Sequence, residues 1–496
     1  MTTATWAPDA MVSTGSPLAA QAGLWALGEG GTAMDAAIAA DAVLGVVQPM
    51  WTGIGGDAFC LVDDGRAVTG FNGSGAAPAA LTRERALGAA AGVGGQRITD
   101  IGIPTGLPDR SPLTVTVPGL VDAWSQLNER FGRIPLATLL EPARRLAADG
   151  YPVGRVAARA WRHVADRLPD DCPLPRSPHA GDRIANPELA ASLDAIAMGG
   201  RDAHYEGGWV KAAVAAVAAA GGVLAEPDLA GHRGEWTQPI RGTYRDHEIL
   251  EHPPNGQGAA VLAAMAALDR EPAGRADDPA TIVATVTAIR DGMRDAARHI
   301  ADPAHADVAD FWVTSGRDTV YTAVVAGGLS VSLITSIFWG FGSGIWAGGV
   351  LLQNRGAGFS LDADSPNVVA PGKRPFHTII PGLVRRDGRP WATFGVVGGP
   401  MQPQGHVQVL RHLIDHGRDP QQALAAPRAR WLAADMVAIE PGFPNGTEDA
   451  LRDAGYDVHH DVPPEEFGGG NVIRTHADGW LEGGADPRRD AVAAGV

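Results

Sequence analysis

One uncharged stretch constrains the fold of this 496-residue chain more than any other feature. Residues 319–352 contain no Asp, Glu, Lys, Arg or His, and the stretch is long enough for a membrane-spanning helix. Gly327-Gly328 and Gly348-Gly349 interrupt it, and β-branched residues dominate between those pairs. The resulting segments have strand lengths, and a Gly-Gly pair suits a tight hairpin turn. The stretch therefore predicts a central hairpin buried on both faces, because such strands read as continuous apolar runs.

The composition of the chain indicates which classes of partner and cofactor are not expected. The chain has 56 acidic and 40 basic residues, a formal net charge of -16, which argues against nucleic-acid and anionic-membrane partners because both need a basic surface. Two cysteines, Cys60 and Cys172, cannot form a disulfide framework or a thiolate zinc site. No metal-binding motif is present, so we expect no metal. The functions considered below also require no organic cofactor. The N-terminus lacks a basic segment followed by an apolar one, which predicts a soluble, cytoplasmic protein.

The chain changes character near residue 318, from helical and charged to strand-rich. We expect helices at 18–27, 33–47 and 402–416, a mainly helical region at 119–310 with one strand at 243–250, a surface loop at 84–112, and strands at 58–62, 319–326, 329–338, 349–352, 379–385 and 391–395. Strands joined as hairpins, rather than alternating strictly with helices, favour an α+β class over a doubly wound sheet.

Several residues are candidate nucleophiles. The triplets around Ser74 and Ser343 come near the G-x-S-x-G pattern of serine hydrolases but do not match it. Cys60 lies inside an expected buried strand, where it suits a small core residue. Thr319 begins a buried strand directly after Asp318. A threonine hydroxyl needs an adjoining base, and cleavage before Thr319 would supply its own α-amine. Local sequence alone fits an ordinary turn before a strand equally well.

The whole chain resembles the γ-glutamyltransferase family of N-terminal-nucleophile hydrolases. Similar segments in the first part of the chain lie at 30–37, 45–49, 53–59, 117–119, 139–143 and 149–153. Similar segments in the last part lie at 341–344, 352–360, 373–375 and 395–399. Their number and order make the resemblance specific, although no single segment carries it.

The resemblance implies a proenzyme with a four-layer αββα sandwich that cleaves itself between Asp318 and Thr319. The large subunit would be 1–318 and the small subunit 319–496, held together as one intertwined domain. Thr319 would attack an amide carbonyl, its α-amine would take the proton, and water or an amine would resolve the acyl-enzyme.

Three further positions match the family's catalytic parts. The Gly398 and Gly399 amides match its oxyanion hole, where each backbone donor is typically worth about 3 kcal/mol. Ser336 matches a second hydroxyl that assists the N-terminal threonine. The glycines also fit a tight turn, and Ser336 also fits a buried strand serine bonded to backbone.

The residues that read a glutamyl group in the family are replaced here. The stretch 71–78, which includes Ser74 as a candidate substrate contact, has no arginine for the α-carboxylate. Gly358 stands at the position of the acid that holds the α-amine, and His377 and Thr378 match the paired serines. Losing a bidentate clamp and its ammonium partner removes most glutamate-specific binding.

Arg355, beside the missing acid, and His377 could bind a carboxylate on another acyl group. Arg355 could equally form a structural salt bridge to the nearby acidic loop. The pattern resembles the family's acylase-like branch. We therefore expect an autoprocessed threonine-dependent amidase or acyltransferase that acts on a small-molecule amide other than a plain γ-glutamyl amide. Two alternatives stay open: γ-glutamyl transfer or glutathione hydrolysis with substitute ligands, and an unprocessed binding protein.

Overall fold

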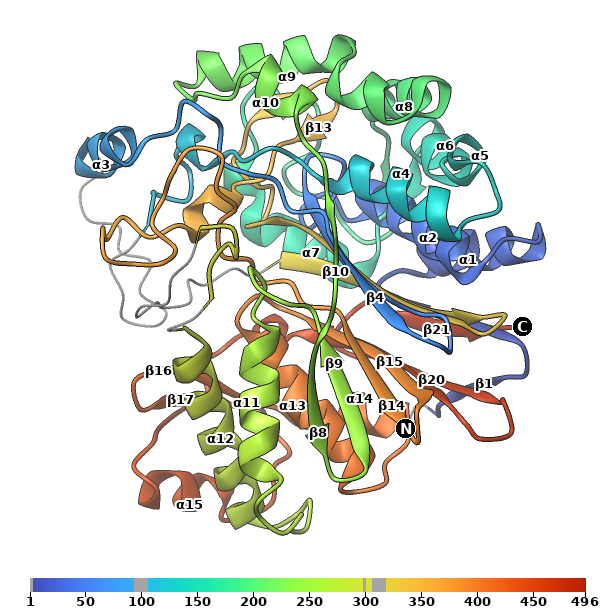
Figure 1. The fold of residues 1–496 in the computed structure, drawn as a ribbon, viewed down its shortest axis with the longest axis vertical. Helices are drawn as coiled ribbons and strands as arrows, with labels where there is room; N and C mark the ends of the chain where they lie inside the picture. The colour runs from blue at the N-terminus through green and yellow to red at the C-terminus, as the bar shows by residue number, and fades with distance from the viewer. Residues whose placement is uncertain (1–2, 93–105, 298–299, 306–317) are drawn as a thin grey trace.

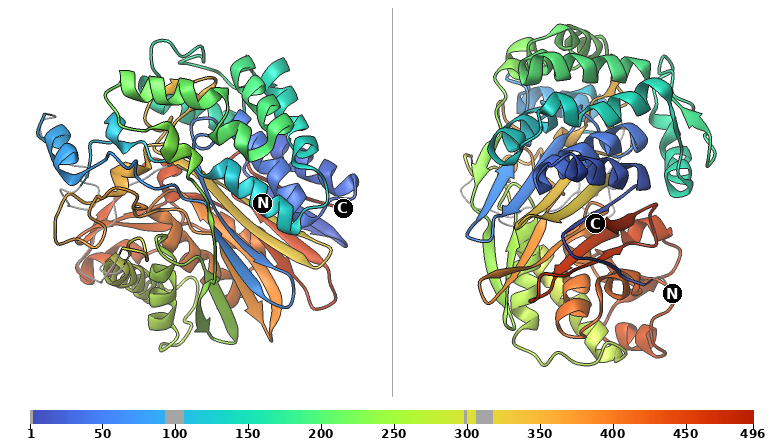
Figure 2. Two further views of the ribbon diagram at one scale, coloured as in Figure 1. Left: turned by 45° about the horizontal axis from the view of Figure 1, so that its top comes forward. Right: turned by 90° about the vertical axis from the view of Figure 1, so that its right-hand side faces the viewer.

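The computed structural model describes residues 3–92, 106–297, 300–305 and 318–496. Two seven-stranded sheets lie face to face, and helices cover the outer side of each, which gives four layers in the order αββα (Figures 1 and 2). One sheet runs in the order β1 (Thr5–Ala7), β20 (Leu481–Ala485), β19 (Gly469–Thr475), β15 (Arg389–Val397), β14 (Gly382–Arg386), β9 (His247–Glu251) and β8 (Ile240–Tyr244). The other runs β21 (Val492–Gly495), β2 (Ala10–Thr14), β10 (Asp318–Ala326), β11 (Leu329–Phe338), β3 (Asp57–Asp63), β4 (Val68–Asn72) and β7 (Glu235–Thr237).

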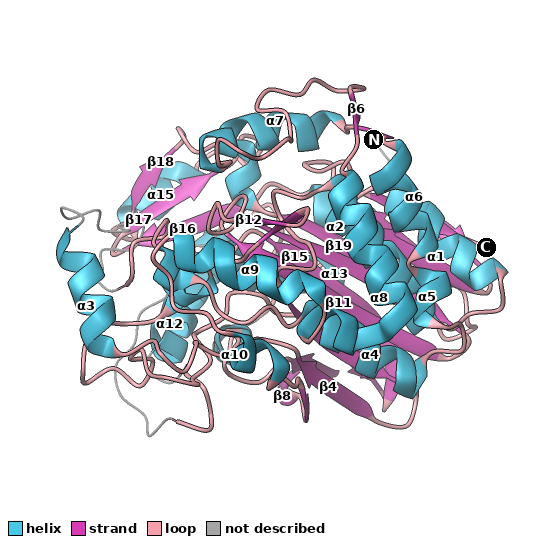
Figure 3. Cartoon of the chain, turned by 90° about the horizontal axis from the view of Figure 1, so that it is seen from above, coloured by secondary structure: helices cyan, strands magenta, loops and turns pink. Residues whose placement is uncertain are grey.

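The helices divide between the two outer layers. Figure 3 looks down on the larger layer, which covers the sheet that contains β10 and β11. Its helices are α1 (Pro17–Gly28), α2 (Ala33–Val47), α4 (Leu120–Phe131), α5 (Leu136–Leu139), α6 (Glu141–Asp149), α7 (Arg155–Val164), α8 (Pro187–Tyr205), α9 (Gly208–Ala219) and α10 (Glu226–Ala230). The opposite layer contains α11 (Gly258–Leu268), α12 (Pro279–Ala297), α13 (Met401–Ile414), α14 (Pro420–Ala425) and α15 (Thr447–Asp453).

Smaller elements decorate these layers. They are α3 (Arg83–Gly92), the strand pairs β5 (Tyr151–Pro152) with β6 (Arg183–Ile184) and β12 (Trp346–Ala347) with β13 (Val350–Leu351), and the three strands β16 (Ala429–Ala433), β17 (Met436–Ile439) and β18 (Asp457–His459). Short 3-10 turns lie at η1 (Pro112–Thr114), η2 (Ala165–Arg167), η3 (Arg355–Gly358) and η4 (Pro464–Phe467).

The predicted central hairpin is confirmed. β10 and β11 pair antiparallel, and β2 and β3 flank them on either side. Gly327 and Gly328 have φ angles of 58° and 81°, the left-handed conformation that a two-residue hairpin turn of this kind requires at both central positions. Helix α2, buried along its whole length, packs across β10 and β11. In the described parts of the chain no helix is both long and apolar enough to cross a membrane.

Local signals predicted some elements and missed others. Thr32 caps α2 in a capping box with Asp35. Cys60 is a fully buried residue of β3, as expected. The loop prediction for 84–112 is wrong for 84–92, which form most of α3, while 93–105 lie outside the described residues. The single strand expected at 243–250 is two strands, β8 and β9, turned at Arg245.

Both sheets take strands from before and after residue 318. The sheet with β10 and β11 includes β2, β3, β4 and β7 from the first part, and the other sheet includes β1, β8 and β9 from the first part. Apolar residues of both parts, such as Phe59, Tyr321 and Ile473, meet in one buried cluster between the sheets. The two parts therefore share a core and cannot be independent domains.

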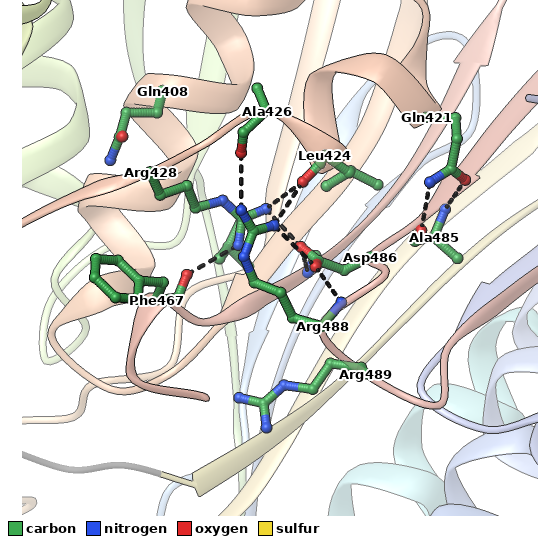
Figure 4. Close-up of polar contacts among 12 residues, drawn as sticks. Gln408, Gln421, Leu424, Ala426, Arg428, Phe467, Ala485, Asp486, Arg488 and Arg489 are labelled. Carbon is green, nitrogen blue, oxygen red and sulfur yellow. Dashed lines mark hydrogen bonds and ion pairs between the residues drawn. The ribbon is translucent and has the colours of Figure 1, made fainter. Parts of the chain in front are cut away.

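The connection between β20 and β21 carries the chain from one sheet to the other and holds a buried ion cluster (Figure 4). Asp486 accepts hydrogen bonds from Arg428 at 2.5 Å and from Arg488 at 3.1 Å. Arg428 also donates to the carbonyl oxygen of Phe467 at 2.9 Å. Burial opposes ionisation of Asp486, but the two arginines hold its pKa below the usual range.

We expect Arg428→Met to lower the free energy of unfolding by about 3 kcal/mol, because it leaves the Asp486 carboxylate buried with one arginine instead of two. The matched control is Arg452→Met, whose ion pair with Glu448 is exposed and should contribute about 1 kcal/mol or less. Denaturant unfolding of both variants measures the difference, and equal losses would contradict the assignment of Arg428 to the core.

Candidate active site

Thr319 is the second residue of β10 and is only 3% exposed. Asp318 pairs with Phe338 and Val320 with Thr335, with an irregularity between them, so Thr319 lies opposite Ser336 and Ile337. Ser336 in turn pairs with Asp57 of β3. The three residues therefore follow one another across neighbouring strands, which lie about 4.8 Å apart in a sheet.

Ser336 is fully buried, and its hydroxyl accepts a hydrogen bond from the Phe338 amide at 2.8 Å. This contact is the one expected of a buried strand serine. A catalytic role for Ser336 stays a prediction, supported by its place next to Thr319.

A glycine turn follows β15 and leads into α13. Gly398 and Gly399 have φ angles of 120° and 59°, conformations that favour glycine. A Cβ on Gly398 would lie 3.0 Å from the Cα of Gly468, so the turn also needs the space. Among the described residues neither glycine N–H has a recorded acceptor. The turn therefore offers two backbone donors at the start of α13.

Gln402, in the first turn of α13, joins this helix to Thr319. Its Nε2 donates to Thr319 Oγ1 at 3.2 Å, and its Oε1 accepts from the Ile380 amide at 2.9 Å. Both Gln402 and Thr319 are buried. The contact places the glycine turn and the Thr319 hydroxyl in the same part of the molecule.

Arg355 begins η3 and is fully buried. Its Nη1 donates to Thr378 Oγ1 at 3.1 Å, and its guanidinium carbon lies 4.1 Å from the centroid of the Phe338 ring. Its Nε and Nη2 atoms are buried without a hydrogen-bond partner. Burial lowers the pKa of Arg355 to about 9, and only the charge of Asp57 opposes this. In the described structure Arg355 makes no ion pair, so the salt bridge to the acidic loop is not formed.

Asp57, which pairs with Ser336 on the neighbouring strand, accepts hydrogen bonds from three separate segments of the chain. Its Oδ1 accepts from the amides of Gly75 and Gly119 at 3.1 Å each and from Gln353 Nε2 at 2.9 Å. Burial raises the pKa of Asp57 to about 7, while the charge of Arg355 and these donors limit the rise.

His377 uses both ring nitrogens in this arrangement. Its Nδ1 accepts from the Ile379 amide at 3.4 Å, which leaves Nε2 to donate to Asp57 Oδ2 at 3.2 Å. Burial and the neighbouring Arg355 and His252 hold the pKa of His377 well below its usual value. His377 is therefore neutral and oriented by Asp57.

Thr378 links Arg355 to the glycine turn. Gln257 Nε2 donates both to the Thr378 carbonyl oxygen at 2.5 Å and to that of Gly399 at 2.9 Å. Gly358 closes η3, and a Cβ there would lie 2.7 Å from the Phe376 carbonyl oxygen. No acidic side chain fits at that position without a shift of the backbone.

Ser74 precedes Gly75, whose amide donates to Asp57. Its hydroxyl donates to Asn72 Oδ1 at 2.7 Å and accepts from Asn255 Nδ2 at 3.3 Å. It also lines a separate cavity of about 330 Å³ with His232 and Arg374. Ser74 is thus tied into an amide network rather than to Arg355.

Sequence reasoning missed four polar residues that organise the site. Asp57 and Gln353 lie inside segments similar to the family, 53–59 and 352–360, but carried no assigned role. Gln257 and Gln402 gave no local signal, because a glutamine near a glycine turn is common. Within the described ranges no group of three His, Cys, Asp or Glu side chains is placed to hold a metal ion.

The two facing antiparallel sheets between helical layers, with a threonine at the start of a central strand, define the N-terminal-nucleophile hydrolase class. The family model for gamma-glutamyltranspeptidase matches residues 19–316 and 309–496. The chain belongs to the gamma-glutamyltranspeptidase family, which confirms the resemblance and the predicted fold.

Curated relatives and a solved structure agree along the full length. The chain is 34% identical to a glutathione hydrolase-like YwrD proenzyme of Bacillus subtilis, over 98% of each chain. It is 33% identical to an oxamate amidohydrolase proenzyme of Klebsiella pneumoniae, over 96% of this chain and 97% of that one. A cephalosporin acylase from Bacillus halodurans is 36% identical and superposes with a TM-score of 0.92, covering 100% of this chain and 97% of that chain. The chain is therefore an N-terminal-nucleophile amidase or acyltransferase made as a proenzyme.

Proposed function

We propose that cleavage of the Asp318–Thr319 peptide bond separates a large subunit, 1–318, from a small subunit, 319–496, and makes Thr319 the catalytic nucleophile. The shared core supports this division, because each sheet contains strands of both parts that pair with one another and would hold the two products together. The freed α-amine of Thr319 takes the hydroxyl proton while Oγ1 attacks the substrate's amide carbonyl.

The glycine turn and Ser336 complete the proposed catalytic group. The Gly398 and Gly399 amides, which have no recorded acceptor among the described residues, are free to donate to the oxyanion that forms on the substrate carbonyl. Ser336, across from the start of β10, assists the threonine. Water or an amine then resolves the ester on Thr319. The predicted location of the protein is the cytoplasm.

We further propose that the acyl group carries a carboxylate that binds Arg355. The observation that carries this proposal is the buried guanidinium with two unpartnered nitrogens. A buried cation with unpaired donors costs free energy, and an anionic ligand group would offset that cost. Thr378 orients the guanidinium through its hydroxyl, His377 holds Asp57 beside it, and Ser74 supports the loop next to Asp57.

Gly358 determines which substrate group the proposed site does not bind. With no room for an acidic side chain at Gly358 and with Arg355 close by in the chain, an ammonium group on the substrate finds no anionic partner in η3. The proposed site at Arg355 therefore favours a simple dicarboxylic acyl group over an amino-dicarboxylic one.

Three anilides test this proposal, because they differ only at the end of the acyl chain. Glutaryl anilide carries the carboxylate alone, γ-glutamyl anilide adds an ammonium group, and 5-methylhexanoyl anilide replaces the carboxylate by an isopropyl group. We expect kcat/KM for glutaryl anilide to exceed both others by at least about 10-fold, since a site built for one polar group rejects analogues that leave it unpaired. Preference for γ-glutamyl anilide would instead support γ-glutamyl transfer, and preference for the neutral anilide would leave Arg355 without a substrate role.

A further inference from the structure

The orientation of the Gln402 amide can be assigned from its partners. The backbone N–H of Ile380 can only donate, so the Gln402 atom 2.9 Å from it must be the oxygen. The other end of the side chain, the NH2 group, then faces Thr319 Oγ1 at 3.2 Å. Thr319 Oγ1 is the acceptor in this bond, and its own proton points elsewhere.

Two other glutamines of α13 show that this contact is particular to Gln402. Gln404 and Gln408 are also buried, and each accepts a backbone N–H through Oε1, from Trp431 and Ala429 respectively. Both direct their NH2 groups only to backbone carbonyl oxygens. Helix α13 thus carries three glutamines in similar environments, and only the NH2 group of Gln402 reaches a side-chain hydroxyl.

We propose that Gln402 is a catalytic residue that stabilises negative charge on Thr319 Oγ1, both in self-cleavage and in turnover. This inference rests on Thr319 as the nucleophile. A hydrogen bond to a charged acceptor is roughly twice as strong as one to a neutral acceptor. A donor held against Oγ1 therefore favours loss of the hydroxyl proton.

The same donor acts at each step in which Oγ1 gains charge. In self-cleavage Oγ1 bonds to the Asp318 carbonyl carbon, the C–N bond to Thr319 breaks, and the hydroxyl proton passes to the departing amine. Water then hydrolyses the ester, which gives the Asp318 carboxylate and restores the Thr319 hydroxyl. Oγ1 gives up a proton in the first step and is the leaving oxygen in the second, and Gln402 Nε2 can donate to it in both.

Two substitutions separate the donor from the shape of the side chain. Gln402→Met removes the donor, and we expect self-cleavage and kcat to fall by about 100-fold, the loss typical of one donor to a developing oxyanion. Gln402→Glu keeps the acceptor for Ile380 but replaces the NH2 group. We expect it to be slow at pH 8 and to recover at least about 10-fold relative to wild type at pH 5, because a protonated carboxyl group can again donate to Oγ1.

The matched control is Gln408→Glu, which alters a buried glutamine of the same helix that contacts only backbone. It should cleave and turn over within about threefold of wild type at both pH values. Intact mass followed over time reports self-cleavage, the most reactive anilide reports turnover, and circular dichroism reports folding. Wild-type rates in Gln402→Met would overturn the inference.

If Gln402→Met does not fold, the Gln402→Glu profile decides, and a profile parallel to that of wild type overturns the inference. Thr319→Ala is measured beside these variants. If it still cleaves, the proposed nucleophile is wrong. If it is inert while both Gln402 variants behave as wild type, only the role of Gln402 fails.

Discussion

Thr319→Ala is expected to remain a single chain of 51.3 kDa, whereas the wild type separates under denaturing conditions into fragments of ~33 and ~18 kDa. The variant keeps the backbone of β10 but removes the oxygen that attacks the Asp318 carbonyl, so both self-cleavage and amide hydrolysis should be abolished. The smaller wild-type fragment should begin with the sequence Thr-Val-Tyr-Thr. Intact mass and N-terminal sequencing measure both results.

Thr319→Ser is the matched control, because it keeps the hydroxyl and removes only a methyl group. We expect it to cleave, at a reduced rate, since the methyl group helps to fix the rotamer of a β-branched side chain. Cleavage of Thr319→Ala at the same bond, or a small fragment with a different first residue, would refute the assignment of the nucleophile. Loss of cleavage in both variants would indicate that the methyl group itself is required for the reactive rotamer.

The central hairpin and the paired helices before it could be predicted because their signals are local. Glycine pairs, β-branched runs and a capping Thr32 act within a few residues of one another. The fold class followed from hairpins in place of strict alternation. The loop prediction for 84–112 is wrong where α3 lies, because Gly, Pro and Arg content describes the stretch as a whole and does not reveal that residues 83–92 form a helix.

The proposed catalytic residues were predicted from the resemblance to the family, which depends on the order of many segments along the chain. Local sequence patterns did not indicate them. Taken by itself, Thr319 is an ordinary threonine at the start of a strand. It becomes a candidate nucleophile only together with the surrounding segments that resemble the family. What no local signal could provide is the convergence of distant segments. Gln402 reaches Thr319 from a helix that begins 82 residues later in the chain. Gln257, which precedes residue 318 in the chain, bridges Thr378 and Gly399, which follow it.

The role of Arg355 also could not be predicted from the sequence alone. The sequence left a structural salt bridge and a substrate contact as equal interpretations. In the structure Arg355 has two unpartnered nitrogens and no ion pair among the described residues, and these two observations support the proposed substrate contact. Arg428 is equally buried but binds Asp486 and two backbone carbonyl oxygens. Two arginines of similar burial therefore carry opposite expectations for the same substitution.

Arg355→Met is expected to lower kcat/KM for glutaryl anilide by about 100-fold or more, because a charge-assisted hydrogen bond to a buried carboxylate is worth about 3 kcal/mol. Turnover of 5-methylhexanoyl anilide should stay unchanged or rise, since the pocket becomes apolar. Arg355→Lys keeps the charge but not the planar fork, so it should lie between wild type and Arg355→Met. The kcat/KM values of wild type, Arg355→Lys and Arg355→Met for both anilides show how each substitution changes the preference between the two acyl groups.

The stability of Arg355→Met distinguishes a substrate contact from a structural residue. Asp57, whose pKa is already raised to about 7, can take up a proton when the neighbouring charge is removed. Replacing an unpaired buried cation by an apolar side chain should then leave the free energy of unfolding unchanged or raise it by about 1 kcal/mol, whereas Arg428→Met lowers it. A residue whose loss stabilises the fold and removes recognition of the anionic acyl group is retained for substrate. A loss of stability equal to that of Arg428→Met, with the ranking of the anilides unchanged, would instead place Arg355 in the structural core.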